Sequence, residues 1–167
     1  MFLQLMKRLG EAETLDPAVR TAEPLASRLI ADARLRSFFH GDATGIPPHV
    51  ILTRVPLGAW FMAMFLDLFP DDGSRLAARR LVGLGVVAAA PAGLSGWAEW
   101  ARADHTTRRI GVVHAGANLV ATLIFLASWH ARRRERHRLG VALARVGAIL
   151  LVVGGFLGGY MRSVQRP

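Results

Sequence analysis

Two histidines are the side chains of this sequence with the clearest capacity for chemistry. His49 stands at the start of one apolar stretch and His114 lies within another. If both stretches are helices that face one another, two neutral imidazoles could hold a haem iron between them. The sequence therefore offers His49 and His114 as candidate haem ligands and haem as the candidate cofactor. A metal site completed by Glu99 is a weaker alternative, because there is no histidine pair at i, i+4 spacing and no carboxylate-rich cluster.

Further polar and aromatic side chains are expected in the interior of the same protein. Asn118 follows His114 by one helical turn and can form a hydrogen bond to a neighbouring helix. Other polar and aromatic residues fall near the ends of the apolar stretches. If the helices alternate in direction, these residues lie in the same half of the membrane as the two histidines. The expected polar cluster consists of Trp60, Trp97, Glu99, Trp100, Asn118 and Tyr160.

No motif predicts a catalytic site, so an enzyme is the less favoured interpretation. The sequence has no cysteine, which excludes disulfides, thiolate nucleophiles and cysteine-ligated iron–sulfur clusters in this chain. Leu94-Ser95-Gly96 lacks the strand–turn–helix context of a nucleophile elbow. Ionisable groups in or near the apolar stretches leave a small transporter or ion pathway as an alternative. Four spans are few for a transporter, and no inverted repeat is visible.

The elements that must position these residues are four apolar stretches. Each has about 20 residues, the length that crosses a hydrocarbon core of about 30 Å as a helix. The chain is 52% hydrophobic yet carries a formal net charge of +9, which fits apolar spans joined by charged loops. We therefore expect an all-α integral membrane bundle of four transmembrane helices. The stretches cover approximately residues 49–69, 81–101, 110–129 and 139–161.

The first 47 residues are expected to form an amphipathic arm that precedes a four-helix transmembrane domain over residues 48–167. Apolar residues recur at helical spacing from about residue 18 to 39, with arginines between them. This pattern predicts one amphipathic helix at the membrane surface or against the bundle. Glycines and prolines at residues 41–48 end the arm.

The first apolar stretch has a patterned face. At about 100° per residue, His49, Thr53, Trp60 and Asp67 fall on one narrow stripe, which should face the interior. Asp67 lies close to the end of the stretch. There it is expected to reach water or a nearby arginine such as Arg79 or Arg80.

The arginines are distributed unevenly between the connections. Eight follow the first and third stretches, whereas five follow the second and fourth, so the first set is expected to be cytoplasmic. Both termini would then be non-cytoplasmic, in a bacterial inner membrane. The run Arg132–Arg138 is expected to attract anionic lipid rather than nucleic acid. The eight are Arg75, Arg79, Arg80, Arg132, Arg133, Arg134, Arg136 and Arg138, and the five are Arg102, Arg108, Arg109, Arg162 and Arg166.

The fourth stretch ends in two overlapping Gly-x-x-x-Gly patterns over residues 154–159. Small residues at this spacing let helices approach closely. The contact can form within one molecule or between two copies, so a homodimer stays open.

Several of these motifs together resemble a bacterial family of four-span membrane proteins known as domain of unknown function 2231. The resemblance covers nearly the whole chain, but Ile46, Val50, Arg54 and Tyr160 depart from the family's usual residues. Some family members are joined to Rieske-type domains, which implies membrane electron transfer and a redox-complex partner. The matching stretches are Gly45-Ile46-Pro47-Pro48-His49-Val50, Pro56-Leu57-Gly58-Ala59-Trp60, Leu66-Asp67, Ser95-Gly96-Trp97-Ala98-Glu99-Trp100, Gly111-Val112-Val113-His114 with Asn118, and the glycine-rich end.

The sequence favours a structural or accessory membrane subunit, or an anchor, whose histidines fix the register of the helices. The alternative is a haem-binding electron-transfer subunit that uses His49 and His114.

Overall fold

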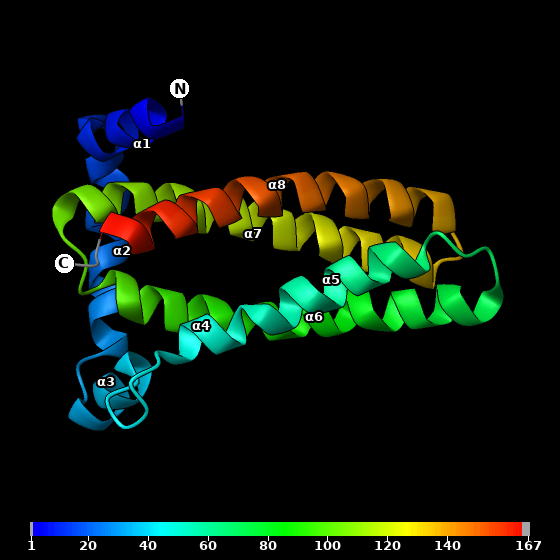
Figure 1. Ribbon diagram of the computed structural model, residues 1–167, viewed down its shortest axis with the longest axis horizontal. Coiled ribbons are helices and arrows are strands. Elements are labelled where there is room, and N and C mark those ends of the chain that lie inside the picture. The colour runs from blue at the N-terminus through cyan, green and yellow to red at the C-terminus, as the bar shows by residue number, and fades with distance from the viewer. Residues whose placement is uncertain (1, 165–167) are drawn as a thin grey trace. The chain divides into compact units, whose positions relative to one another are not determined.

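The computed structural model describes residues 2–164, and all regular elements within that range are helical (Figure 1). Arg166, one of the arginines used for the expected orientation, lies outside the described residues. The helices are α1 (Phe2–Glu11), a 3-10 turn (Glu13–Leu15), α2 (Asp16–Leu29), α3 (Ala33–His40), α4 (Pro48–Leu52), α5 (Arg54–Leu66), α6 (Asp72–Trp100), α7 (His105–Arg133) and α8 (His137–Val164).

Four helical segments are long and apolar enough to cross a membrane: Pro48–Leu66, Asp72–Trp100, His105–Arg133 and His137–Ser163. The predicted fold class, an all-α integral membrane bundle of four spans, is confirmed. The last three helices extend beyond the predicted apolar stretches at one or both ends, because charged residues that were expected in the connections occupy helical end turns. The first span instead ends at Leu66, before the predicted residue 69. Arg75 and Arg79, for example, lie in the first turns of α6.

The surfaces of these helices agree with a lipid environment. Large apolar side chains are exposed along all four spans, where a soluble protein would carry polar faces. In lipid such side chains are solvated by acyl chains, so their exposure carries no penalty. They include Phe61, Met62, Phe65, Leu84, Val87, Leu119, Leu123, Ile149 and Phe156.

The chain forms two compact units, and α6, α7 and α8 contribute residues to both. Unit 1 contains Met1–Val50, Gly93–Gly116 and Val153–Pro167. Unit 2 contains Ile51–Ala92 and Ala117–Val152. The N-terminal arm therefore shares a unit with parts of the long helices, although the sequence division treats it separately.

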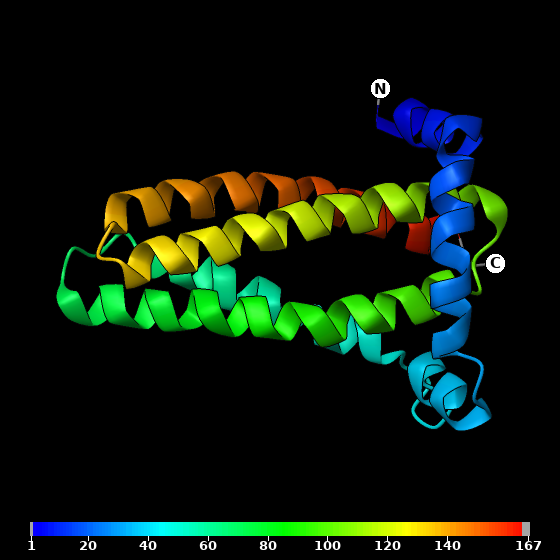
Figure 2. The same ribbon diagram turned by 180° about the vertical axis from the view of Figure 1, so that it is seen from behind.

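Unit 2 is a four-helix packing in which α5 and parts of α6, α7 and α8 lie side by side (Figures 1 and 2). Its core combines two large aromatic rings with many alanines, which allow the helices to approach closely. Trp60 and Phe125 stack with ring centroids 4.2 Å apart and planes inclined by 3°. Around them lie Ala63, Ala78, Val82, Ala121, Ala144, Ala148 and Leu151.

Unit 1 joins the arm to the end of α6 and the start of α7. Val19 and Ala26 of α2 pack with Trp100 of α6, and Figure 2 shows α2 running across these helices rather than along them. A second cluster brings Met6 of α1 against Ile110 of α7, together with Leu157 of α8. The arm is therefore held by buried apolar contacts.

The prediction of one helix over residues 18–39 is wrong, because this range is divided between two helices, α2 and α3. The Asp32 carboxylate accepts hydrogen bonds from the backbone N–H groups of Arg34 and Leu35 at 2.9 and 3.0 Å. This N-cap starts α3 and separates it from α2. Gly41 then ends α3 with φ of 70°, a conformation that glycine adopts without steric cost.

Candidate functional site

His49 lies in α4 and belongs to unit 1, where it is half-buried against α6. Its Nδ1 is 3.3 Å from the Ser95 hydroxyl oxygen. The ring also covers Gly96, and a Cβ added at that glycine would lie 2.9 Å from His49 Cε1. The imidazole of His49 therefore packs against two consecutive residues of α6, Ser95 and Gly96.

His114 lies in α7, and its ring also packs against a neighbouring helix, here α8. Its Nδ1 is 2.9 Å from the Gly154 carbonyl oxygen, and a Cβ at Gly158 would lie 3.0 Å from its Cε1. A carbonyl oxygen can only accept, so Nδ1 of His114 carries the hydrogen. In the neutral ring Nε2 is then the unprotonated nitrogen, the form of imidazole nitrogen that can accept a hydrogen bond or bind a metal.

The two candidate ligands belong to the same unit. Among the described residues, no three His, Asp or Glu side chains are grouped so that they could hold a metal ion. Glu99 is therefore not grouped with His49 and His114 as a third ligand among these residues.

The other members of the expected polar cluster are divided between the units. Trp97 and Trp100 form a T-shaped pair with ring centroids 5.1 Å apart in unit 1, and Trp100 Nε1 donates to the Arg108 carbonyl at 2.9 Å. Tyr160 packs beside the cluster of Met6, Ile110 and Leu157 in the same unit. Trp60 and Asn118 instead belong to unit 2.

Glu99 is half-buried in unit 1. Its Oε1 is buried and has no hydrogen-bond partner among residues 2–164. Burial of an unpartnered carboxyl oxygen opposes ionisation and costs free energy.

Two consecutive arginines, which the sequence analysis did not single out, fasten the arm to α7. Arg109 binds Asp16 through two hydrogen bonds of 2.7 and 2.9 Å and donates to the Gly10 carbonyl at 3.1 Å. Arg108 donates to Glu23 at 2.6 Å. No spacing rule connects residues so far apart in sequence.

Asp16→Asn is expected to lower the unfolding temperature of the purified protein. The hydrogen bond from Arg109 holds the pKa of Asp16 below its usual 3.8, so its stabilising contribution is present above that value. The contribution is lost as pH falls through the lowered pKa. Thermal unfolding of both proteins across this range should show the difference between them shrinking with acidification. Asp42→Asn, at an exposed position without a described ion pair, is the control.

A second polar site lies in unit 2, where Asp67 follows α5 and Arg132 lies near the end of α7. The guanidinium donates to both carboxylate oxygens at 2.6 Å, and the two side chains are 1% (Arg132) and 3% (Asp67) exposed. Arg132 Nε also donates to the Ser128 hydroxyl at 3.2 Å, and that hydroxyl donates to the Gly140 carbonyl at 2.6 Å. These bonds connect the ends of α5 and α7 with the start of α8.

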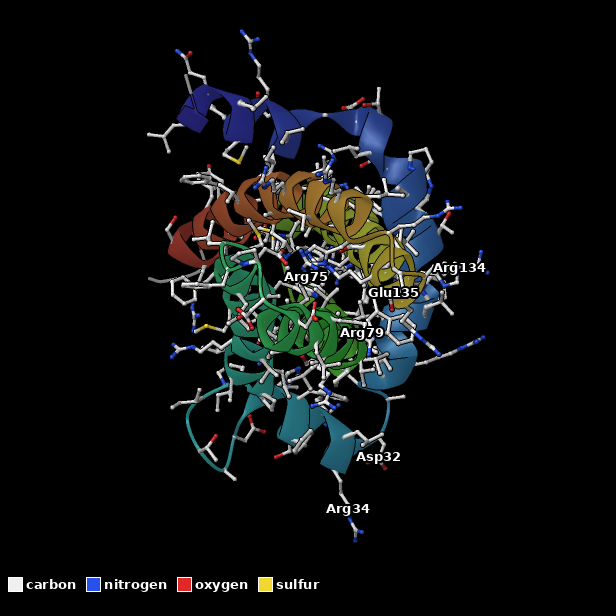
Figure 3. All side chains as sticks on the ribbon, turned by 90° about the vertical axis from the view of Figure 1, so that its right-hand side faces the viewer. Asp32, Arg34, Arg75, Arg79, Arg134 and Glu135 are labelled. Carbon is white, nitrogen blue, oxygen red and sulfur yellow. The ribbon has the colours of Figure 1, made fainter. Side chains whose placement is uncertain are left out.

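This site corrects two expectations. Asp67 was expected to reach water or a nearby arginine such as Arg79 or Arg80; it does pair with an arginine, but that arginine is Arg132, and the carboxylate is buried. The run Arg132–Arg138 was expected to attract lipid as a whole, but Arg132 is buried and already paired. Figure 3, which looks onto this end of unit 2, shows Arg134 extending outward and Arg79 and Glu135 lying close together. The Arg79 Nη1 and Glu135 Oε1 atoms are 3.9 Å apart.

The glycine-rich end of α8 has two different faces. Gly154 and Gly158 contact His114, so this face is used within the molecule. A Cβ at Gly155 or Gly159 would meet no described atom within 4 Å. Among the described residues, the contact of these glycines with His114 is therefore made by the face of Gly154 and Gly158.

Comparison of the sequence with protein-family models, with curated proteins and with solved structures found no match. The function must therefore be inferred from the helices and polar groups described above.

Proposed function

We propose that this chain is an accessory or anchoring subunit of a membrane complex, and that its polar residues serve to fix the helices. The observation that carries the proposal is the use of these residues in helix-to-helix contacts. Asp67 is held in a bidentate pair by Arg132, and His114 Nδ1 is hydrogen-bonded to the Gly154 carbonyl. Such contacts define helix register in a bilayer, where the apolar surface does not distinguish one packing from another.

We further propose that the chain is a member of the family of domain of unknown function 2231 in a bacterial inner membrane. The resemblance supports membership, and the arginine distribution supports cytoplasmic α5–α6 and α7–α8 connections with non-cytoplasmic termini. Cysteines introduced at Ser74 and Thr106, in a chain that has none, would test this orientation. A membrane-impermeant thiol reagent on intact cells should label the cysteine at 106 and not that at 74.

A haem-binding electron-transfer subunit is the second candidate, favoured by the tautomer of His114. The Gly154 carbonyl holds the hydrogen on Nδ1, so Nε2 is the unprotonated nitrogen of the neutral ring. Both histidines also belong to unit 1. His49 and His114 would hold the haem iron, and haem would supply one-electron chemistry when bound.

An absorption spectrum of the detergent-purified protein, oxidised and dithionite-reduced, separates the two candidates. The cells should be supplied with a haem precursor during expression. The accessory-subunit proposal predicts no Soret band and a lower unfolding temperature for His114→Ala, which loses the bond to Gly154. A Soret band that shifts on reduction and disappears in both His49→Ala and His114→Ala would contradict it and identify a cytochrome-like carrier.

A further inference from the structure

Unit 2 contains an open pocket with a volume of about 360 Å³ between the residues that follow α5 and the first turns of α6 and α8. Its α8 wall is formed by His137, Arg138, Val141, Ala142 and Arg145. The last four of these positions are spaced by three or four residues, so they share one face of the helix. Two arginines therefore stand at the two ends of a short apolar strip.

Arg145 is the unusual member of this wall. It lies eight residues after His137, the first residue of α8, and therefore about 12 Å along the helix axis. The residues around it belong to a membrane span, yet its side chain is exposed. Among the described residues it has no ion-pair partner, and an arginine at this depth requires an anion or a path to water.

The rest of the pocket adds positive charge and apolar surface. Arg75 of α6 reaches the pocket, shares its charge with Asp72 at 3.4 Å, and lies at this end of the unit in Figure 3. Asp67 also lines the pocket, but its carboxylate is neutralised by Arg132. Leu68 and Phe69 contribute exposed apolar side chains beside the basic groups.

We propose that this pocket binds the phosphate of an anionic phospholipid, with Arg138 and Arg145 as the main cationic contacts and Arg75 as a third. A guanidinium forms paired hydrogen bonds with phosphate oxygens, which an ammonium cannot match. The apolar strip at Val141 and the exposed Leu68 and Phe69 would contact the acyl chains. Arg145 then obtains its counter-charge from the bilayer.

Native mass spectrometry of the purified protein tests the site with phosphatidylglycerol and phosphatidylcholine of identical chains. Retention of phosphatidylglycerol over phosphatidylcholine is expected. Arg138→Gln and Arg145→Gln should each weaken phosphatidylglycerol binding about tenfold, the effect of losing one charge-assisted hydrogen bond. Arg145→Lys should retain part of the binding. Arg80→Gln and Arg134→Gln, at exposed arginines outside the pocket, are the matched controls and should leave binding unchanged.

Three results would overturn the proposal. Equal retention of the two lipids, which both carry a phosphate, would show that the net negative charge of an anionic phospholipid is not recognised. An equal loss in the control variants would show that general positive charge, not the pocket, attracts the lipid. Displacement of phosphatidylglycerol by excess inorganic phosphate would assign the site to free phosphate instead of lipid. Circular dichroism of each variant establishes that it is folded, and Arg138→Gln tests the same pocket if Arg145→Gln does not fold.

Discussion

Asp67→Ala is expected to reduce the free energy of unfolding in detergent by about 3–5 kcal/mol, because it leaves Arg132 buried without its counter-charge. The guanidinium is 1% exposed and its remaining described hydrogen-bond partner is the Ser128 hydroxyl. Unfolding monitored by circular dichroism during titration with a denaturing detergent measures the loss.

Two further variants test whether the loss of stability comes from leaving a buried charge unpaired. Asp67→Ala combined with Arg132→Met removes both charges, so it should be more stable than Asp67→Ala alone. Arg79→Ala removes an ion pair that is 3.9 Å long and largely exposed at Glu135, where a change of about 0–1 kcal/mol is expected. A loss in Asp67→Ala no larger than in Arg79→Ala would mean that the buried pair does not hold these helix ends together.

Gly85→Ala is expected to destabilise the protein by about 1–3 kcal/mol, the usual cost of overpacking a filled core. An added Cβ would collide with the Trp60 indole, at 2.6 Å from its Cδ1. The indole cannot easily move aside, because it is stacked on Phe125 and its Nε1 donates to the Val82 carbonyl at 3.2 Å. The same detergent titration measures the effect.

Gly93→Ala is the matched control in the same helix. A Cβ at Gly93 would meet no described atom within 4 Å, and alanine favours a helix by about 1 kcal/mol over glycine. Stability should therefore be unchanged or slightly raised. If both alanine variants behaved alike, close contact at Gly85 would not limit the approach of α5 and α6.

The sequence predicted the parts of this fold that depend on local pattern. Apolar length predicted the four spans, because a helix in lipid must satisfy its own backbone hydrogen bonds. The arm was predicted as helical, but its break at Asp32 was missed, since the apolar spacing continues across a cap. The structure shows that the Asp32 carboxylate accepts hydrogen bonds from two backbone N–H groups as the N-cap of α3. The apolar spacing alone would place Asp32 on the polar face of a continuous helix.

The polar contacts were harder to predict because they depend on tertiary distance. Asp67 was correctly seen as a charged residue in need of a partner, yet arginines near it in sequence, such as Arg79 and Arg80, were preferred to Arg132, which is 65 positions away. Arg108 and Arg109 were counted as loop charges, although they bind Glu23 and Asp16 of the arm. For His49 and His114 the residue type indicated a role, whereas the glycines that seat their rings could not be assigned without the structure.

Three of the four tryptophans face a glycine of a neighbouring helix: Trp60 at Gly85, Trp100 at Gly111 and Trp129 at Gly83. The indole of each tryptophan is fluorescent, and these three indoles lie at points where two helices are in contact. Separation of α5 from α6, or of α6 from α7, would remove an indole from its contact with a glycine and change the polarity of its surroundings. The intrinsic emission of the unlabelled protein should therefore report when these helices come apart.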